Sequence, residues 1–333
     1  MSEFTDYVAV RRDCPLLLGL VGPSGSGKTF SALELATGIV SVKGGEIFFI
    51  DTEAGRALHY ADRFKFRHVP FHPPFSPARY KAAIEYCVGR GATCIIIDSM
   101  THEHSGDGGV LDMAERFLED KCGHDFAKRE RMKLLSFAKP KAERKALNNY
   151  IVQLGSKCAM ILCYRAHEKL DFVNKVDGKP RPLGFQPETT SPLMYEMAQQ
   201  FLLRPCCDGV PELMGNTPEE KTIIKSPSQF RDWFTSNQRL SAEIGARFAK
   251  WAQGDVKADG ATGDATKPSK APTPPATGWL DPGPILYAIT NTETLEDLKA
   301  AYGEFHKARK DYSLDDCAMI TAAKDAAKER LES

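Results

Sequence analysis

The chain has 333 residues, 42% of them hydrophobic, which is enough for one large domain with its own core and a smaller appended module. Its 44 basic side chains balance 44 acidic ones, so the net charge by itself indicates no partner. The longest apolar runs fall far short of the roughly 18 residues that cross a bilayer, so no membrane partner is expected. Nine cysteines without a CxxC pair, and no signal-peptide pattern, predict reduced thiols and a cytoplasmic protein.

Short apolar runs of β-forming residues alternate with helix-like stretches along residues 1–253. These runs lie at 16–21, 47–50, 94–97 and 159–163. Buried parallel strands have this composition, and the intervening helices cover such a sheet. One helix is expected to begin at Pro77, with Ser76 as its N-cap, and to end near Gly89. We therefore predict an α/β fold with a mostly parallel central sheet.

A glycine-rich loop follows the first predicted strand directly. Residues 22–29 read GPSGSGKT, which matches G-x-x-x-x-G-K-[ST], and a helical pattern begins at Thr29. Such a loop surrounds a β-phosphate with backbone amides, and the helix start adds partial positive charge. Lys28 should neutralise phosphate oxygens, and the Thr29 hydroxyl should ligate Mg²⁺, with ATP as the nucleotide. The residues predicted to bind nucleotide here are Gly22, Pro23, Ser24, Gly25, Ser26, Gly27, Lys28, Thr29 and Phe30.

Two carboxylates at strand ends complete a predicted hydrolytic site. Asp98 follows the apolar run at 94–97, a Walker B pattern, and should hold Mg²⁺ mostly through water. Glu53 lies just past the strand at 47–50 and is the predicted base or positioning group for the attacking water. Asp51 is the alternative, although a residue at a strand end more commonly caps or braces the turn. We therefore predict an ATPase with Glu53 and Lys28 as catalytic residues.

The segment FIDTE at 49–53, followed by Tyr60, resembles the RecA segment that carries the catalytic glutamate and a tyrosine that packs on adenine. The resemblance implies these roles for Glu53 and Tyr60. The strand at 159–164 resembles the RecA strand that ends in a phosphate-sensing glutamine and leads into the second DNA-binding loop. Arg165 replaces that glutamine here. It could contact the γ-phosphate directly, or it could pair with a surface carboxylate.

The segments DTEAGRALHY, at 51–60, and DSMTHEH, at 98–104, more specifically resemble phage-encoded AAA-type ATPases that include the minimal RecA-like single-strand annealing proteins. The resemblance covers about residues 14–252. It implies a RecA-like P-loop NTPase core, a ring or filament of copies, and a DNA-stimulated ATPase in a bacterial host's cytoplasm. Annealing or strand pairing on single-stranded DNA is the implied function. A RecA-fold motor or loader in replication or DNA packaging, and a nucleotide-gated adaptor with little turnover, are the alternatives.

Two basic segments are candidates for contact with DNA. Residues 128–145 carry eight basic side chains against two acidic ones, with Phe126 and Phe137 close by. Such a cluster could follow a phosphate backbone, although charge runs on helices are often plain solvated faces. Residues 170–192 are expected to form a long loop at the place of the second DNA-binding loop, where Phe172 and Phe185 could stack on bases. The predicted DNA-binding residues are Lys128, Arg129, Arg131, Lys133, Lys139, Lys141, Arg144, Lys145, Lys175, Lys179 and Arg181.

Two further regions are candidates for contacts outside the phosphate site. Residues 101–109 are expected to form a loop at the place of the first DNA-binding loop of RecA-like proteins. His102 and His104 alternate there, so both could face one side and contact phosphates. Lys221 and Lys225 flank a short predicted strand and could complete a neighbour's ATP site, although surface salt bridges explain them equally well.

The composition changes after residue 253. Gly, Pro, Ala and Thr make up 20 of the 31 residues from 254 to 284, which predicts a flexible linker. Beyond it, apolar residues recur near helical spacing and predict a small helical module at 285–333. This module is mildly acidic. It could bind a basic partner or a single-strand-binding protein, or mask the DNA site.

Overall fold

The computed structural model describes residues 10–155, 157–176, 178–234 and 237–254, then 285, 288–289, 292, 294–308 and 314–332. The chain divides into two compact units, Met1–Thr262 and Gly263–Ser333. Beyond Gly254, the predicted linker lies outside the described residues. The boundaries 1–253, 254–284 and 285–333 therefore stay predictions.

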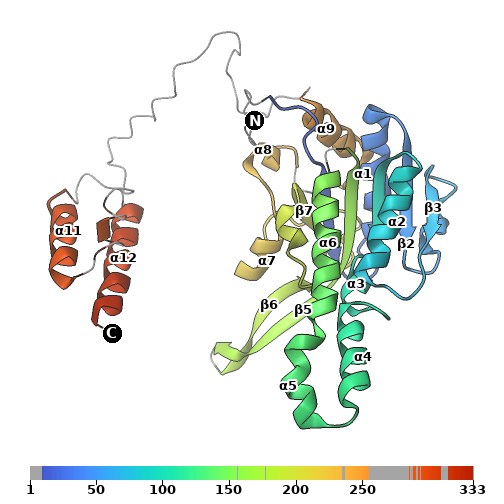
Figure 1. The fold of residues 1–333 in the computed structure, drawn as a ribbon. Helices are drawn as coiled ribbons and strands as arrows, with labels where there is room; N and C mark the ends of the chain where they lie inside the picture. The colour runs from blue at the N-terminus through green and yellow to red at the C-terminus, as the bar shows by residue number, and fades with distance from the viewer. Residues whose placement is uncertain are drawn as a thin grey trace, which may run out of the picture. The chain divides into compact units, whose positions relative to one another are not determined.

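A seven-stranded sheet forms the centre of the first unit (Figure 1). Its order is β3 (Arg67–Pro70), β2 (Glu46–Asp51), β4 (Ala92–Asp98), β5 (Ala159–Val176), β1 (Leu17–Gly22) and β7 (Gln199–Leu202). All of these strands pair in parallel. The remaining strand, β6 (Lys179–Pro187), pairs antiparallel with the distal part of β5. The predicted α/β fold class with a mostly parallel central sheet is confirmed.

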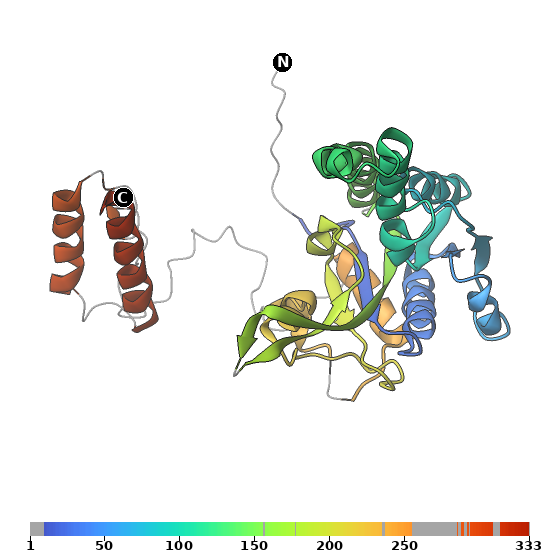
Figure 2. The ribbon, with the colours of Figure 1, turned by 90° about the horizontal axis from the view of Figure 1, so that it is seen from below.

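The two faces of the sheet carry separate apolar cores. They are covered by the helices α1 (Lys28–Lys43), α9 (Ala242–Gln253), α2 (Pro77–Gly89) and α6 (Ala138–Leu154). Alternate residues of a strand point to opposite faces, so Leu18 packs with α1 and α9, whereas Leu17 packs with α2 and α6. Figure 2 shows the sheet between α6 and α1. A Cβ at Gly38 would lie 1.8 Å from the Ala242 carbonyl oxygen, so the close crossing of α1 and α9 requires glycine.

Shorter elements connect the strands and helices of the first unit. They are η1 (Arg56–Tyr60), α3 (Thr101–Ser105), α4 (Val110–Cys122), α5 (Phe126–Ser136), η2 (Pro192–Glu196), α7 (Pro218–Ile223) and α8 (Ser228–Arg231). The α4–α5 hairpin and the β5–β6 hairpin both extend past the sheet (Figure 1). As predicted, α2 begins at Pro77, because the Ser76 hydroxyl accepts a hydrogen bond from the Arg79 amide.

The second unit contains α11 (Leu295–Ala308) and α12 (Leu314–Glu332). Leu298 and Phe305 of α11 are buried with Cys317 and Ile320 of α12 in one apolar cluster. The predicted small helical module therefore has a core of its own. No helix in the described part of either unit is long and apolar enough to cross a bilayer.

Three sequence predictions of local structure are wrong. Residues 101–109 do not form one extended loop, because α3 occupies 101–105 and only residues 106–109 connect it to α4 at Val110. Residues 170–192 are mostly the β5–β6 hairpin. The prolines of β6 are tolerated because this strand pairs with β5 alone, so an amide on its other edge needs no partner strand. Finally, Lys221 lies in α7, and Lys225 lies just past it, rather than beside a strand.

Candidate nucleotide-binding site

The carboxyl ends of β1, β2, β4 and β5 lie at one edge of the sheet, because these strands are parallel. In their register, Gly22 is opposite Arg165, and Asp51 is opposite Asp98. The loops that follow the four strands meet at this edge and line a cavity of about 450 Å³. The predicted site residues that line it are Ser24, Gly25, Gly27, Lys28, Thr29, Phe30, Glu53, Tyr60, Asp98 and Arg165.

The loop between β1 and α1 depends on its glycines. Gly25 and Gly27 adopt φ values of 79° and 90°, which side chains with a Cβ rarely allow. Gly22 is required for a different reason, because a Cβ there would lie 2.3 Å from the Leu203 carbonyl oxygen. The tight loop places the first turn of α1, with its free amides, at the floor of the cavity.

Lys28 is turned toward its own loop. Its ammonium donates hydrogen bonds to the carbonyl oxygens of Gly22, at 2.8 Å, and Pro23, at 2.7 Å. Burial lowers the pKa of Lys28, and the neighbouring Asp98 carboxylate opposes this shift. The ammonium is therefore held by two neutral carbonyls in a desolvated site, where an anionic phosphate would be a stronger partner.

Thr29 and Asp98 form the pair expected for a Mg²⁺ site. The Thr29 hydroxyl donates a hydrogen bond of 2.6 Å to Asp98 Oδ2. Burial raises the pKa of Asp98, while the hydrogen bond from Thr29 and the charge of Lys28 lower it. A desolvated carboxylate beside a hydroxyl is a hard oxygen ligand set, which suits Mg²⁺. The residues present therefore fit the metal.

Glu53 and Arg165, which both line the cavity, form an ion pair. The Arg165 guanidinium reaches Glu53 Oε1 from Nε at 2.9 Å and from Nη2 at 2.5 Å, and reaches Oε2 from Nη2 at 2.5 Å. Arg56, in η1, places a second guanidinium 3.8 Å from the same carboxylate. The alternative that Arg165 pairs with a carboxylate on the surface is wrong, because its partner is the mostly buried Glu53 side chain. The rival candidate Asp51 accepts hydrogen bonds from the Glu53 and Ala57 amides and thus braces the turn.

Aromatic rings line the cavity next to the phosphate loop. Phe30 and Tyr60 lie edge to face with their centroids 6.0 Å apart, and Phe64 packs against both rings. Tyr60 is half-buried, so part of its ring faces the cavity. An aromatic wall of this kind can pack on a nucleotide base.

A segment after β7 contacts the phosphate loop. The Cys207 thiol donates to the Ser26 carbonyl oxygen at 3.3 Å, and a Cβ on Gly27 would lie 2.9 Å from the Gly209 nitrogen. Asp208 of this segment lines the cavity and pairs with Arg239. Sequence reasoning missed both Asp208 and Arg56. Only Arg56 had a signal, since it lies in the DTEAGRALHY segment, while nothing in the sequence links Asp208 to the loop.

Arg144 is not available to DNA. Only 8% of it is exposed, and its guanidinium forms a buried bidentate pair with Glu103 of α3 at 2.8 and 2.7 Å. It also contacts Thr190 and His104. The prediction that Arg144 belongs to the DNA-binding surface is therefore wrong. So is the prediction that His104 faces the phosphates of DNA, because this side chain points at Arg144.

Two other predicted DNA contacts are engaged within the protein. Arg181 pairs with Glu219 at 2.7 Å, and Arg129 pairs with Glu115. Phe185 is buried, so it cannot stack on a base. The remaining predicted contacts are exposed on the two hairpins and on α6. They are Lys128, Arg131, Lys133, Lys139, Lys141, Lys145, Lys175 and Lys179.

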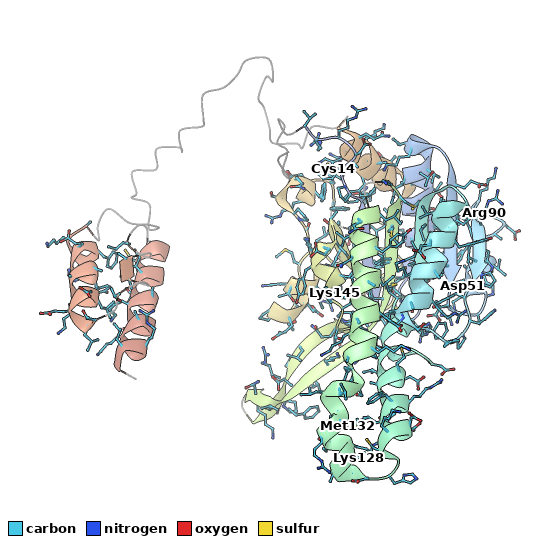
Figure 3. The ribbon with its side chains drawn as sticks, viewed as in Figure 1. Cys14, Asp51, Arg90, Lys128, Met132 and Lys145 are labelled. Atoms are coloured by element: carbon cyan, nitrogen blue, oxygen red, sulfur yellow. The ribbon has the colours of Figure 1, made fainter. Side chains whose placement is uncertain are left out.

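The exposed lysines lie on α6 and on the two hairpins that extend past the sheet. Figure 3 shows Lys128 near the far end of the α4–α5 hairpin and Lys145 along α6. Near the tip of the β5–β6 hairpin, Phe172 and Val173 are 65% and 88% exposed. Asp171 fixes this tip by accepting hydrogen bonds from the Val173 and Asn174 amides.

No family model matches this chain, and no curated protein matches it. Among solved structures, the genome packaging NTPase B204 from Sulfolobus turreted icosahedral virus 2, in complex with sulfate, is similar at a TM-score of 0.26 and 11% sequence identity. The match covers 57% of this chain and 74% of that chain. The comparisons do not identify the site. Its assignment as a nucleotide-binding site therefore rests on the glycine-rich loop, the strand order and the side chains that line the cavity.

Proposed function

We propose that the protein is a Mg²⁺-dependent ATPase that hydrolyses ATP to ADP and phosphate. One cavity combines three parts that this reaction needs. Lys28 lies in the phosphate loop, Thr29 and Asp98 form a pair of hard oxygen ligands, and Glu53 supplies a carboxylate. This combination is the observation that supports the proposal.

The phosphate loop and its neighbours bind and orient the substrate. The Lys28 ammonium exchanges its hydrogen bonds to the Gly22 and Pro23 carbonyl oxygens for contacts with the β- and γ-phosphates. A charged phosphate is a stronger hydrogen-bond partner than two neutral carbonyls. Thr29 and Asp98 hold Mg²⁺, which neutralises charge on the phosphate oxygens when bound. Phe30 and Tyr60 pack on the adenine base.

Glu53 accepts the proton of the attacking water, but only once its oxygens are released. In the site as it stands, Arg165 engages both oxygens of the Glu53 carboxylate. A γ-phosphate offers this guanidinium a competing anion with matching bidentate geometry. The transfer of Arg165 from Glu53 to the γ-phosphate both stabilises the charge of the transition state and frees the base.

Turnover of MgATP tests this proposal. The purified chain should release phosphate only when Mg²⁺ is present, and Lys28→Ala should lower kcat/KM by at least about 100-fold, the scale expected for losing one transition-state donor. Lys145→Ala is a matched control, because this exposed lysine lies on α6, far along the chain from the phosphate loop. Equal turnover by both variants, or no turnover by the wild type, would contradict an ATPase at this site.

A nucleic-acid-dependent role is the finer part of the proposal. Arg165 lies on β5, and the same strand continues into the hairpin that exposes Phe172 and Lys175. Single-stranded DNA bound on that hairpin would thus act on the strand that holds the Glu53 partner. We take annealing or strand pairing in phage recombination as the function, performed by an oligomer, with the C-terminal module recruiting a single-strand-binding protein.

Hydrolysis with and without single-stranded DNA, over a range of salt concentrations, tests this finer role. DNA should stimulate turnover, and salt should weaken the stimulation, because bound lysines displace counterions from phosphates. Pairing of complementary strands would distinguish annealing from a packaging or replication motor, which would instead translocate or unwind. An equal rate of hydrolysis with and without DNA would favour the nucleotide-gated adaptor.

A further inference from the structure

A buried threonine joins the two strand ends that carry the acidic residues of the site. Thr52 immediately precedes Glu53, and its hydroxyl oxygen accepts a hydrogen bond of 2.7 Å from the Ser99 amide. Ser99 immediately follows Asp98. The Thr52 amide in turn donates to the Asp98 carbonyl oxygen at 2.9 Å. The backbone beside Glu53 is therefore fixed to the backbone beside Asp98.

His102 provides a further contact to this threonine. Its Nδ1 lies 2.7 Å from Thr52 Oγ1, whereas the other acceptor for the Thr52 proton, the Ser99 carbonyl oxygen, is 3.3 Å away. The shorter distance favours donation from the Thr52 hydroxyl to Nδ1, with the imidazole proton on Nε2. The ring stacks on Phe75, with centroids 4.9 Å apart and planes 22° apart, so its orientation is fixed.

The first turn of α3 also contacts the strand that carries Arg165. The Thr101 hydroxyl accepts a hydrogen bond of 2.8 Å from the Arg165 amide, and the Met100 amide donates to the Cys163 carbonyl oxygen. One short helix thus contacts Thr52, which is next to Glu53, and Arg165 itself. His102 is its link to Glu53.

We propose that His102 is a positioning residue which, through Thr52, fixes the backbone that carries Glu53 relative to Asp98. This inference depends on the proposed ATPase activity. It assigns His102 a place behind the site, rather than the phosphate contact that the sequence suggests. Burial and the charge of Arg165 lower the pKa of His102, which favours the neutral ring that can accept from Thr52. A displacement of about 1 Å of a catalytic group can lower a rate about 100-fold.

Paired variants separate positioning from general structural support. His102→Ala and Thr52→Val remove the contact, whereas His102→Asn and Thr52→Ser each keep a polar atom near the lost position. The first pair should lower kcat for MgATP about 10- to 100-fold with KM changed less than about 2-fold, since the phosphate loop is untouched. The conservative pair should restore most of kcat. His104→Asn, on the same helix, is the control and should leave kcat unchanged.

Any of three results would overturn the inference. One is that His102→Ala and Thr52→Val keep the wild-type kcat. A second is that the conservative variants are as impaired as the disruptive ones. A third is that KM rises as kcat falls, which indicates a general loss of structure. If His102→Ala does not fold, the comparison of Thr52→Ser with Thr52→Val decides. Absence of wild-type turnover would instead refute the ATPase proposal, and this inference with it.

Discussion

Arg165 holds both carboxylate oxygens of Glu53, with its Nη2 2.5 Å from each. The two residues come from β5 and from the turn after β2, and both line the cavity that the phosphate loop lines. The predicted catalytic base is therefore paired with Arg165, the residue for which the sequence allows a direct contact with the γ-phosphate. A γ-phosphate would resolve this conflict by replacing Glu53 as the partner of Arg165.

Arg165→Gln should weaken the binding of ATP but not the binding of ADP. Because only ATP carries the γ-phosphate that Arg165 contacts, the affinity for ATP should fall while that for ADP stays unchanged. Turnover should fall about 100- to 1,000-fold, as for the loss of an oxyanion donor. Equilibrium titration with each nucleotide and single-turnover hydrolysis measure these effects. An unchanged ratio of ATP to ADP affinity would contradict a role at the γ-phosphate.

Asp98→Asn should raise the stability of the nucleotide-free protein and abolish its stabilisation by MgATP. Burial raises the pKa of Asp98, so its ionised form destabilises the folded protein at neutral pH, and a neutral amide removes that penalty. We expect thermal unfolding without nucleotide to show a gain of roughly 0.5–2 kcal/mol in the free energy of unfolding, the range of single stabilising substitutions. The shift in Tm that MgATP produces should disappear in the variant. A less stable variant, or one that MgATP still stabilises, would contradict the metal role.

Acid should destabilise the protein through two histidines. Burial lowers the pKa of His102 and of His104, with Arg165 and Arg144 respectively adding to the shift. Unfolded imidazoles take up protons near pH 6.5, whereas the folded ones do so only at lower pH. The unfolded state thus binds more protons as the pH falls below 6.5, and the free energy of unfolding decreases.

Urea unfolding at pH 7.5 and 5.5 measures this loss. The variant with both His102→Asn and His104→Asn should lose less stability over that interval than the wild type. The variant is the necessary comparison, since the raised pKa of Asp98 and of Glu103 acts in the opposite sense. An equal loss in both proteins would place the titrating groups elsewhere.

Exposed lysines and the buried Arg144 should behave differently toward DNA. Changing Lys133, Lys139 and Lys145 together to Gln should alter stability little, weaken binding of single-stranded DNA, and reduce the salt slope by about 0.7 per lost contact. Arg144→Met should leave Glu103 buried without a partner and destabilise the fold by about 3–5 kcal/mol. Under conditions in which the Arg144→Met variant is folded, its affinity for single-stranded DNA should equal that of the wild type. Anisotropy of a labelled oligonucleotide would reveal the opposite pattern if Arg144 were the DNA contact.

The sequence predicts the parts of the site that depend on local conformation. The loop from Gly22 to Thr29 has a motif because its backbone needs glycine at fixed positions, and Asp98 follows a short β-branched apolar run that is typical of a buried strand. The parallel sheet follows from such runs as well. Elements of this kind carry their own signal, since each is determined by neighbours along the chain.

Pairings between distant segments were not predictable from one sequence. The partner of Arg165 depends on strand register, and the partner of Arg144 depends on how α3 packs against α6. A basic run shows neither which of its members turns inward nor which carboxylate meets it. The β5–β6 hairpin was missed because its prolines resemble those of a loop, and only its single-edge pairing makes them acceptable.

Steady-state hydrolysis of MgATP by the wild type and by Glu53→Gln tests the central claim most directly. Glutamine keeps the size of the side chain but cannot accept the proton of water. We expect the variant to bind ATP as tightly as the wild type and to turn it over about 100- to 10,000-fold more slowly, the range for a lost general base. Turnover by Glu53→Gln at the wild-type rate would contradict the assignment of Glu53 as the base and of this cavity as the catalytic site.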